Sequence, residues 1–439
     1  MTLPVNTLPA ALSPQTWPFE LALLPTSAYL VGGSVRDVLL ERQADYLDLD
    51  FVLPEAAIET AQLIAKHYQV GFVVLDAHHK IARVVFPQAT VDFAQQVGPS
   101  LETDLRRRDF TVNAIAYHPH TRQLIDPLQG GQDLKKRLLR MISMDNLAAD
   151  PLRLLRAYRQ AAQLDFRVEP QTQVAIRRLA DLLTQVAAER VRGELDALLS
   201  KPAGTAQLKA CCQDRLLQGW LPQITADSLQ TVAAIDQAYS DLQTHWPGYA
   251  SLVTGWFKEQ SVPGMHRSWL KAAKLSQLLT LDEAIAEAEL IHLKYSRAEQ
   301  QVVLATLRNQ TRLTPLQVRS LSIREQYDLF RDTSQSFLSL SILALALQYP
   351  AERVYALIQR FLNPADPVAH PTTLISGRTL MQKLQLRPGR HIGQLLESIQ
   401  LAHAEGKVTN AAEALDWAQL AIQHQEISVS KNYGLRRDR

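Results

Sequence analysis

Cysteine is the scarcest informative residue in this chain. Only two of the 439 residues are cysteines, and they are neighbours, Cys211 and Cys212. Adjacent cysteines give no disulfide framework and lack the ligand spacing of a structural zinc site. The scarcity therefore predicts a protein of a reducing compartment whose fold depends on neither disulfides nor structural zinc.

Long hydrophobic runs are also missing. The most apolar segment, residues 336–347, is too short to cross a bilayer. The first basic residue is Arg36, so the opening stretch lacks the basic start of a signal peptide and the arginine-rich character of a transit peptide. We expect a cytoplasmic protein without a membrane partner.

Glycine and proline are too few for a fibrous or disordered chain. The sequence has 17 Gly and 22 Pro, with 46% hydrophobic and 21% charged residues. This composition supplies enough apolar material to bury cores along the whole chain. Because a single core stops growing at roughly 250–300 residues, a chain of 439 residues is expected to form more than one domain.

An excess of one charge is absent overall but present locally. The net charge is only +2, yet the segment from Lys135 to Arg167 holds eight basic and three acidic residues. Such an excess is typical of a surface that meets a phosphate-rich partner, although basic runs are more often solvated helix faces. The charge pattern therefore favours a nucleic-acid partner only together with other evidence.

Strand and helix signals share the first part of the chain, and helix dominates after Asp133. A first helix is predicted at 35–41, among short β-rich runs at 28–31, 46–53, 71–75, 81–86 and 90–93. Downstream, apolar residues recur every three or four positions, with breaks predicted near 144–146, 201–204, 246–248 and 363–367. The pattern predicts an α+β protein, in which a small mixed sheet with helices precedes an all-helical remainder.

A glycine pair separates the first strand from the first helix. In Gly32-Gly33-Ser34-Val35-Arg36-Asp37, backbone N–H groups at a strand-to-helix turn can meet a phosphate, and glycine permits a close approach of the chain to a ligand. Taken alone, the segment is equally compatible with a plain tight turn. Its interpretation depends on the residues that follow.

Two carboxylates follow on the next strand. Asp48 and Asp50 are two residues apart, so both point to one face of a strand whose other residues are mostly apolar. An unpaired acidic couple in a buried strand is costly, and a divalent metal ion would stabilise it. Asp92, in the β-rich run 90–93, is a candidate third carboxylate, with a solvent-facing acid as the alternative.

Two further clusters combine arginines with carboxylates. Residues 107–114 read Arg-Arg-Asp-Phe-Thr-Val-Asn-Ala, in which the guanidinium groups suit bidentate phosphate contacts. Asp150 precedes Pro151 at a predicted helix start, with Arg153 one turn later on the same side. Each cluster also has a plainer interpretation, an exposed basic turn for the first and an N-cap with a surface ion pair for the second.

The order of these clusters is more informative than any one of them. The motifs are Gly32-Gly33-x-Val35-Arg36-Asp37, Asp48-x-Asp50, Arg107-Arg108-Asp109-Phe110-Thr111-Val112-Asn113-Ala114, Asp126-Pro127 with Gly130 or Gly131 before Asp133-Leu134, Asp150-x-x-Arg153 and Glu189-Arg190-Val191-x-x-Glu194-Leu195. As a set they resemble the signature of the class II tRNA nucleotidyltransferase and bacterial poly(A) polymerase family. The resemblance covers residues 28–199 and returns faintly at 375–408, whereas the middle of the chain shows none.

The resemblance implies an architecture of four parts. A nucleotidyltransferase head of the polymerase β type would occupy residues 1–140. A helical neck with a base-reading motif would follow at 141–204, then a helical body at 205–365 and a helical tail at 366–439. The oligomeric state stays open.

The resemblance also implies a reaction on the 3′ end of tRNA with CTP and ATP. Asp48 and Asp50 would coordinate Mg²⁺, with Asp92 as a further catalytic carboxylate. Lys135 and Lys136 would contact the RNA. The residues implied to hold the nucleotide are Gly32, Gly33, Arg36, Arg107, Arg108, Asp109, Asn113, Asp150, Arg153 and Arg156.

Asp150 and Arg153 resemble the pair that reads the incoming base in this family. A carboxylate accepts from an exocyclic amine and a guanidinium donates to a ring nitrogen, which suits cytosine and adenine but not uracil or guanine. The family usually has Glu just before this Asp, where this chain has Ala149. The pair in this chain therefore lacks the carboxylate that usually precedes it.

The stretch between Asp92 and Asp109 is a second departure from the family, which usually has a flexible loop there. Only sixteen residues, 93–108, separate the two, which resembles enzymes that add the two cytidines and stop. Full CCA synthesis, CC addition alone and poly(A) synthesis all remain open, because these activities share the same catalytic residues. A catalytically dead RNA-binding protein is a further alternative, against which the intact Asp48 and Asp50 argue.

Overall fold

The computed structural model describes residues 10–42, 46–256 and 267–423. The chain divides into two compact units, residues 1–222 and 223–439, which are described separately below. The finer division into head, neck, body and tail stays a prediction. In the described ranges, no helix is long and apolar enough to cross a membrane.

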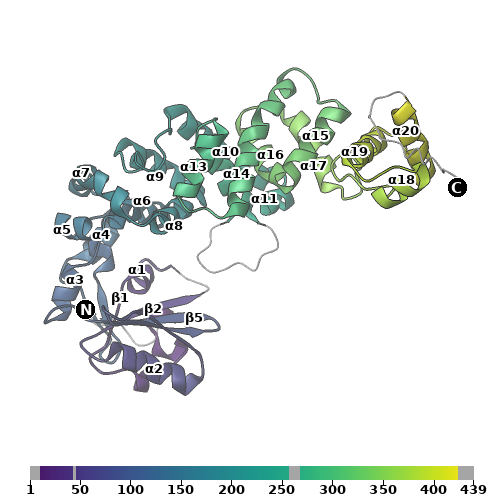
Figure 1. Ribbon diagram of the computed structural model, residues 1–439. Helices are drawn as coiled ribbons and strands as arrows, with labels where there is room; N and C mark the ends of the chain where they lie inside the picture. The colour runs from purple at the N-terminus through teal and green to yellow at the C-terminus, as the bar shows by residue number, and fades with distance from the viewer. Residues whose placement is uncertain (1–9, 43–45, 257–266, 424–439) are drawn as a thin grey trace. The chain divides into compact units, whose positions relative to one another are not determined.

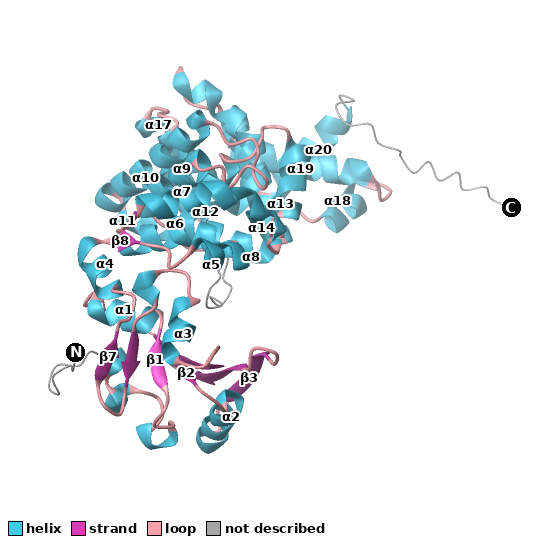
Figure 2. Cartoon of the chain, turned by 90° about the vertical axis from the view of Figure 1, so that its left-hand side faces the viewer, coloured by secondary structure: helices cyan, strands magenta, loops and turns pink. Residues whose placement is uncertain are grey.

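The first unit contains a seven-stranded mixed sheet in the order β3-β4-β5-β2-β1-β6-β7 (Figure 2). Only β2 and β5 run parallel; every other neighbouring pair is antiparallel. The strands are β1 (Tyr29–Val31), β2 (Leu47–Leu53), β3 (Gly71–Asp76), β4 (Ile81–Phe86), β5 (Ala89–Gln95), β6 (Ala116–His118) and β7 (Gln123–Ile125). The first five were predicted to within two residues at each end, whereas the three-residue strands β6 and β7 were not predicted.

The two faces of the sheet have different roles. Helix α2 (Ala57–Tyr68) packs on one face, and α1 (Gly33–Leu39) lies on the other side (Figure 1). Phe51 on β2 and Phe93 on β5 are buried and stacked, with ring centroids 5.6 Å apart. Because side chains alternate along a strand, this buried set leaves Asp48 and Asp50 on the opposite, open face.

Short helices and a second, two-stranded sheet complete the first unit. The helices are α3 (Leu101–Arg106), α4 (Gly130–Lys136), α5 (Met144–Ala149), α6 (Leu152–Leu164), α7 (Pro170–Leu179), α8 (Ala188–Leu199) and α9 (Pro202–Gln213), with 3₁₀ turns at Ala10–Leu12, Pro14–Thr16, Leu21–Leu23, Thr111–Asn113 and Ala180–Gln185. The parallel strands β8 (Leu138–Leu139) and β9 (Arg167–Val168) correct the expectation that only helix follows Asp133. The break predicted near 144–146 falls at the start of α5, where Ser143 caps the helix by accepting from the Asn146 N–H.

The second unit is helical throughout its described residues. Its helices are α10 (Ala226–His245), α11 (Pro247–Thr254), α12 (Trp269–Ser276), α13 (Glu283–His292), α14 (Arg297–Asn309), α15 (Ile323–Thr333), α16 (Phe337–Ala346), α17 (Ala351–Leu362), α18 (Gly377–Leu384), α19 (Arg390–Ala404) and α20 (Ala411–Gln423), with 3₁₀ turns at Gln310–Gln317 and Ser334–Ser336. The breaks predicted at 201–204, 246–248 and 363–367 agree with the ends of α8, α10 and α17.

Two buried lysines of the second unit are each paired with a carboxylate. Lys271 on α12 is 2% exposed and its Nζ lies 2.9 Å from Glu299 Oε1. Lys274, one turn further along the same helix, is fully buried and pairs with Asp236 on α10. The helix α16 packs against both α10 and α12 and is almost entirely apolar and buried. The two ion pairs therefore lie within the core of this unit.

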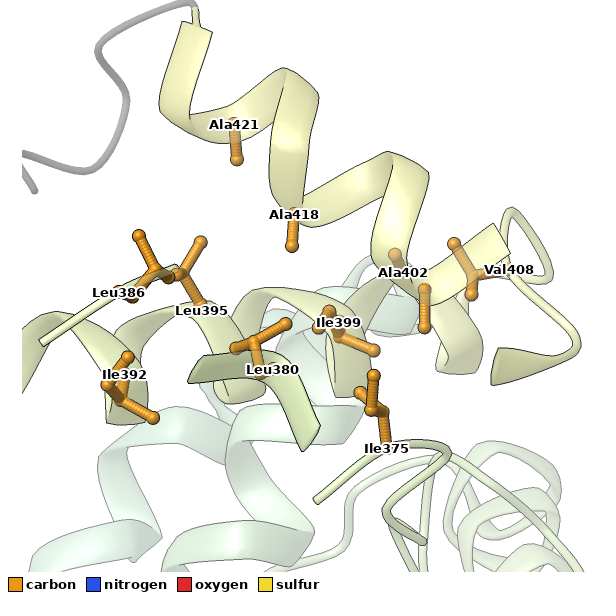
Figure 3. Close-up of a cluster of buried hydrophobic side chains, with 11 residues drawn as sticks. Ile375, Leu380, Leu386, Ile392, Leu395, Ile399, Ala402, Val408, Ala418 and Ala421 are labelled. Carbon is orange, nitrogen blue, oxygen red and sulfur yellow. The ribbon is translucent and has the colours of Figure 1, made fainter. Parts of the chain in front are cut away.

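The last three helices pack around their own small core (Figure 3). Leu380 from α18, Leu395 and Ile399 from α19, and Ala414 and Ala418 from α20 are all buried there. The alanines on α20 let that helix approach α19 closely, because a methyl group leaves little bulk between two helices. This core coincides with the segment where the resemblance returned faintly.

Candidate active site

A pocket of about 500 Å³ opens on the free face of the head sheet. Ten of the residues predicted for the site line it: Gly32, Gly33, Arg36, Asp48, Arg107, Arg108, Asp109, Asn113, Arg153 and Arg156. The volume falls within the range of small-molecule sites. Segments far apart in the sequence thus meet at one place.

Asp48 on β2 lines the pocket, and Asp50 lies two residues further along the same strand. Parallel pairing places Asp48 beside Thr90 and Asp50 beside Asp92. The Thr90 hydroxyl donates to Asp48 Oδ1 at 2.6 Å. Burial, followed by the charges of Asp48 and Asp92, raises the pKa of Asp50 to about 7. Clustered carboxylate oxygens that repel one another are the donor set a hard divalent cation prefers, so these residues fit such an ion.

Asp92 lies where it was predicted, on the same face and directly beside Asp50. Both of its carboxylate oxygens accept from Arg83 on β4, at 2.6 Å from Nε and 2.8 Å from Nη2. Within the described parts of the chain, no group of three acidic, histidine or cysteine side chains is arranged to hold a metal. Its role as a third catalytic carboxylate stays a prediction.

The glycine turn brings the backbone close to the carboxylates. Gly32 has φ +78°, a conformation that favours glycine. A Cβ added there would lie 3.1 Å from Asp50 Oδ2 and 3.7 Å from Arg108 Nη1. The turn therefore leaves room beside Asp50 that any side chain would occupy.

The arginines of the site are held by hydrogen bonds from several elements. Arg36 on α1 donates to Asn113 Oδ1 at 2.7 Å and makes two bonds to Asp37. Arg108 lies 3.2 Å from Asp104 on α3, and its buried Nε has no hydrogen-bond partner in the described structure. A half-buried guanidinium with an unused donor beside two carboxylates is suited to an anionic ligand.

Asp109 and Asn113 form a second layer under these arginines. Asp109 is buried and accepts from its neighbour Phe110 N–H and from Asn113 Nδ2 at 2.9 Å. Arg156 on α6 approaches the other Asp109 oxygen at 3.5 Å. Asp109 therefore links the 3₁₀ turn 111–113 to α6, so its observed contacts are with protein groups.

The Asp126 to Asp133 motif has a structural function. Asp126 accepts from the backbone N–H groups of Gly130 and Gly131, at 2.7 and 2.9 Å. A Cβ at Gly130 would lie 2.2 Å from the Thr111 carbonyl, and Asp133 accepts from the Thr111 hydroxyl. The motif thus packs α4 directly against the turn that carries Asn113.

The predicted base-reading pair lies at the junction of α5 and α6. Asp150 follows the end of α5 and its side chain caps no helix, which corrects the N-cap interpretation. Its Oδ2 lies 3.0 Å from Arg190 Nη2 and 3.9 Å from Arg153 Nε. Arg153 Nη1 donates to the carbonyls of Arg107 and Asn146, and burial lowers the pKa of Arg153.

Several residues of the site were missed by the sequence analysis. Glu194 on α8 pairs with Arg156 and Arg159 on α6, and Arg190 pairs with Asp150. Glu194 and Arg190 lie in a recognised motif, but partners on another helix cannot be read from spacing. Arg83 could have been noticed from the sequence, because it is a charged residue between Ile81 and Val85 on one face of a predicted strand.

Lys135 and Lys136 lie apart from the pocket. Both are exposed at the end of α4, together with Arg137. Neither lysine lines the pocket. Their predicted contact with RNA therefore concerns a surface outside the pocket.

Three stretches of the chain match known protein families. Residues 28–140 match the family described as Poly A polymerase head domain, and residues 165–228 match a probable RNA and SrmB-binding site of polymerase A. Residues 265–418 match a family described as tRNA nucleotidyltransferase domain 2, putative. This last match falls largely on the middle region, where no resemblance had been found.

Full-length relatives give the same result. A CC-adding tRNA nucleotidyltransferase from Synechocystis sp. is 46% identical over 408 residues, which are 92% of this chain and 96% of that protein. An A-adding tRNA nucleotidyltransferase from Deinococcus radiodurans is 34% identical over 436 residues, covering 90% and 95%. A solved CCA-adding enzyme in complex with ATP has a TM-score of 0.69 at 22% identity, covering 90% of this chain and 91% of that one.

The fold and these relatives define an enzyme of the nucleotidyltransferase class, and they confirm the predicted fold class. The chain belongs to the family of tRNA nucleotidyltransferases and poly(A) polymerases.

Proposed function

We propose that this protein transfers nucleotides to the 3′ end of tRNA without a template, with CTP as its principal substrate. The observation that carries the proposal is the pocket that brings Asp48 and the neighbouring Asp50 together with the glycine turn and the arginine cluster. In the reaction, the RNA 3′ oxygen bonds to the α-phosphorus of the nucleotide. The bond from the α-phosphorus to the β-phosphate oxygen breaks, and pyrophosphate leaves.

Asp48 and Asp50 would hold the divalent cation, which we assign as Mg²⁺. When bound, the ion lowers the pKa of the attacking hydroxyl and neutralises the triphosphate. The protein's own contribution is position: the Thr90 hydroxyl fixes Asp48, and the absence of a side chain at Gly32 leaves space at Asp50.

The triphosphate would lie along Gly32, Gly33 and the guanidinium groups of Arg107 and Arg108. Arg108 has an unused buried donor, and Arg107 is half exposed at the pocket wall. Arg36 and Asn113, bonded to each other, would hold the ribose side of the nucleotide. Charged donors fixed before the ligand arrives stabilise developing charge without reorganising during the reaction.

Asp150 and Arg153 would read the base. Arg153 is held by two backbone carbonyls and Asp150 by Arg190, so neither side chain is free to rotate without losing a hydrogen bond. A carboxylate that must face the carbonyl of uracil would lose its partner, and such a loss costs about 1–3 kcal/mol. Asp150 thus has Arg190 as its partner, with Ala149 at the preceding position, where the family usually has Glu.

CC addition is the form of the activity that we favour. It is supported by the relative named as CC-adding, the more similar of the two described above. The connection from β5 to α3 consists of residues 96–100 only. Gln96 N–H donates to the Leu53 carbonyl, and Val97 N–H donates to Asp104. A short connection bonded to β2 and to α3 has little freedom to drive a change of base specificity.

The test uses purified protein with Mg²⁺, CTP or ATP alone, and tRNA ending before CCA, after C or after CC. We expect cytidine to be added up to CC and a weak or missing adenosine step. Asp48→Asn should be inactive, while Glu59→Gln, on α2 across the sheet, should behave as wild type. Equal rates of adenosine and cytidine addition would instead show synthesis of the whole CCA end.

Two other outcomes would replace the proposal. ATP addition to any RNA without CTP use would indicate a poly(A) polymerase. RNA binding without any addition, under all nucleotide and metal conditions, would indicate a dead nucleotidyltransferase head.

A further inference from the structure

On the open face of the head sheet, the carboxylates of β2 have β1 on one side and β5, β4 and β3 on the other. On the β1 side, Gly32 and Arg108 lie next to Asp50. On the other side lie β5, β4 and β3, and the only residue predicted there for the site was Asp92. The function proposed above leaves this second side without a ligand.

Arg83 on β4 is a cation on that second side. Arg83 on β4 pairs in register with Asp92 on β5, which pairs in register with Asp50 on β2. Strands in a sheet are about 4.8 Å apart, so the backbone of Arg83 lies roughly 10 Å from that of Asp50. Arg83 is 38% exposed, and its bonds to Asp92 use Nε and Nη2, so Nη1 takes no part in them.

Apolar side chains surround Arg83 on the same face. Val85 lies two residues along β4, and Val73 pairs with Arg83 across the β3–β4 ladder. Both are exposed, Val85 by 41% and Val73 by 49%. A cation fixed among exposed apolar side chains offers a phosphate contact next to a surface for a sugar or base.

The chemistry of the reaction assigns an occupant to this side. In-line displacement requires the attacking oxygen and the departing pyrophosphate to lie on opposite sides of the α-phosphorus. If the triphosphate lies along Gly32 and Arg108, the attacking RNA oxygen approaches from the β5–β4 side. The RNA 3′ end then lies over Arg83.

We propose that Arg83 binds a backbone phosphate at the 3′ end of the RNA substrate. This inference rests on the proposed function and adds a subsite to it. Asp92 acts as a positioning residue: its two hydrogen bonds fix the guanidinium plane, so that Nη1 is presented to the phosphate. Val73 and Val85 contact the terminal nucleotide.

The test compares four variants with wild type in steady-state kinetics. Arg83→Gln removes the charge, and Arg83→Lys keeps the charge without the bidentate geometry. Arg83→Gln with Asp92→Asn removes both charges and so leaves the local net charge unchanged. Arg122→Gln is the matched control, an arginine at the β6–β7 turn at the other end of the same sheet.

We expect Arg83→Gln to raise the KM for tRNA by about tenfold, as for a lost charge-assisted contact, with the KM for CTP within twofold of wild type. The slope of log affinity for RNA against log salt should fall by about 0.7, the value for one single-strand phosphate contact. Arg83→Lys should recover part of the RNA affinity. The double variant should stay impaired, and Arg122→Gln should match wild type.

Two results would overturn the inference. Wild-type tRNA KM in the double variant would show that Arg83 only balances the charge of Asp92. A rise in the CTP KM without a change for tRNA would place Arg83 on the nucleotide. The proposed function is tested separately by wild-type CTP addition, so a wild type that adds CMP and an Arg83→Gln variant that behaves like Arg122→Gln would refute the subsite alone.

Discussion

Charged side chains are compensated in opposite ways on α12 and on the open face of the head sheet. On α12 of the second unit, Lys271 and Lys274 each meet one carboxylate. On the open face of the head sheet, Asp48 and Asp50 stand side by side next to Asp92, and the pKa of Asp50 is raised. Each charge of a matched buried pair is compensated by its partner, whereas grouped like charges are costly unless a ligand compensates them. A group of like charges is therefore a better indicator of a functional site than a buried ion pair.

The strongest test of this comparison removes one carboxylate from the group formed by Asp48, Asp50 and Asp92. Asp50→Asn should lower the rate of CTP addition by three orders of magnitude or more, since several kcal/mol of transition-state stabilisation are lost with the cation. Thermal stability should be equal to or above wild type, because a like-charge repulsion disappears. Calorimetry and single-turnover kinetics measure the two effects.

Glu59→Gln serves as the control for this experiment, as an exposed acid on the opposite side of the sheet. A large loss of stability in Asp50→Asn would contradict the comparison. Retained turnover would contradict the assignment of the metal ligands.

The reverse test breaks a matched pair. Lys274→Met should lower the free energy of unfolding by about 3–5 kcal/mol, because Asp236 keeps its charge without its lysine. Lys274→Met combined with Asp236→Leu should recover most of that loss. Denaturant unfolding, with CTP addition assayed in parallel at low temperature, provides the measurement. If the single variant is as stable as wild type, the pair does not behave as a structural unit.

A smaller effect is expected when the base-reading carboxylate Asp150 is changed, and it should appear in the choice between CTP and UTP. In Asp150→Asn, an amide N–H can face the carbonyl of uracil, so discrimination between CTP and UTP should fall by about ten- to a hundredfold. Competition assays with both nucleotides measure the ratio of kcat/KM values. Arg190→Lys keeps a cation beside Asp150 and should change the ratio far less. Unchanged discrimination in Asp150→Asn would remove this residue from the base-reading pair.

The smallest effect is expected for tRNA affinity when the exposed lysines of α4 are changed. Lys135→Glu with Lys136→Glu should weaken tRNA binding several-fold and equally for different tRNA sequences, because phosphates are contacted without base reading. The loss should shrink as salt is raised. Filter binding at several salt concentrations checks this, with Lys66→Glu and Glu59→Lys on α2 as a charge-exchange control. Affinity that does not depend on salt would contradict an RNA contact at α4.

The sequence analysis predicted most of the pocket because its signals are local. Period-two spacing places Asp48 and Asp50 on one face, and a glycine pair between strand and helix indicates a turn. The strands β6 and β7 were missed because three residues are too few to show alternation, whereas β1, equally short, is marked by the glycine pair that follows it. The two-residue strands β8 and β9 were missed for the same reason.

Partners across the fold were not predictable by these means. The pairing of Arg83 with Asp92 depends on the register of two strands, and the pairing of Arg190 with Asp150 depends on the packing of α8 near the start of α6. Register and packing come from tertiary contacts, which a single sequence does not display. The structural function of Gly130 was hidden for the same reason, since its neighbour is a carbonyl of the 111–113 turn.

The Arg83–Asp92 pair also has a consequence for the order of folding. The two residues are partners in the β4–β5 hairpin, only nine positions apart, whereas β2 must pair with β5 across the intervening α2, β3 and β4. Local hairpins close faster than long-range parallel pairings. We therefore expect Asp92 to reach Asp50 with its charge already compensated by Arg83. The long-range pairing of β2 with β5 would then be spared the repulsion of three uncompensated carboxylates.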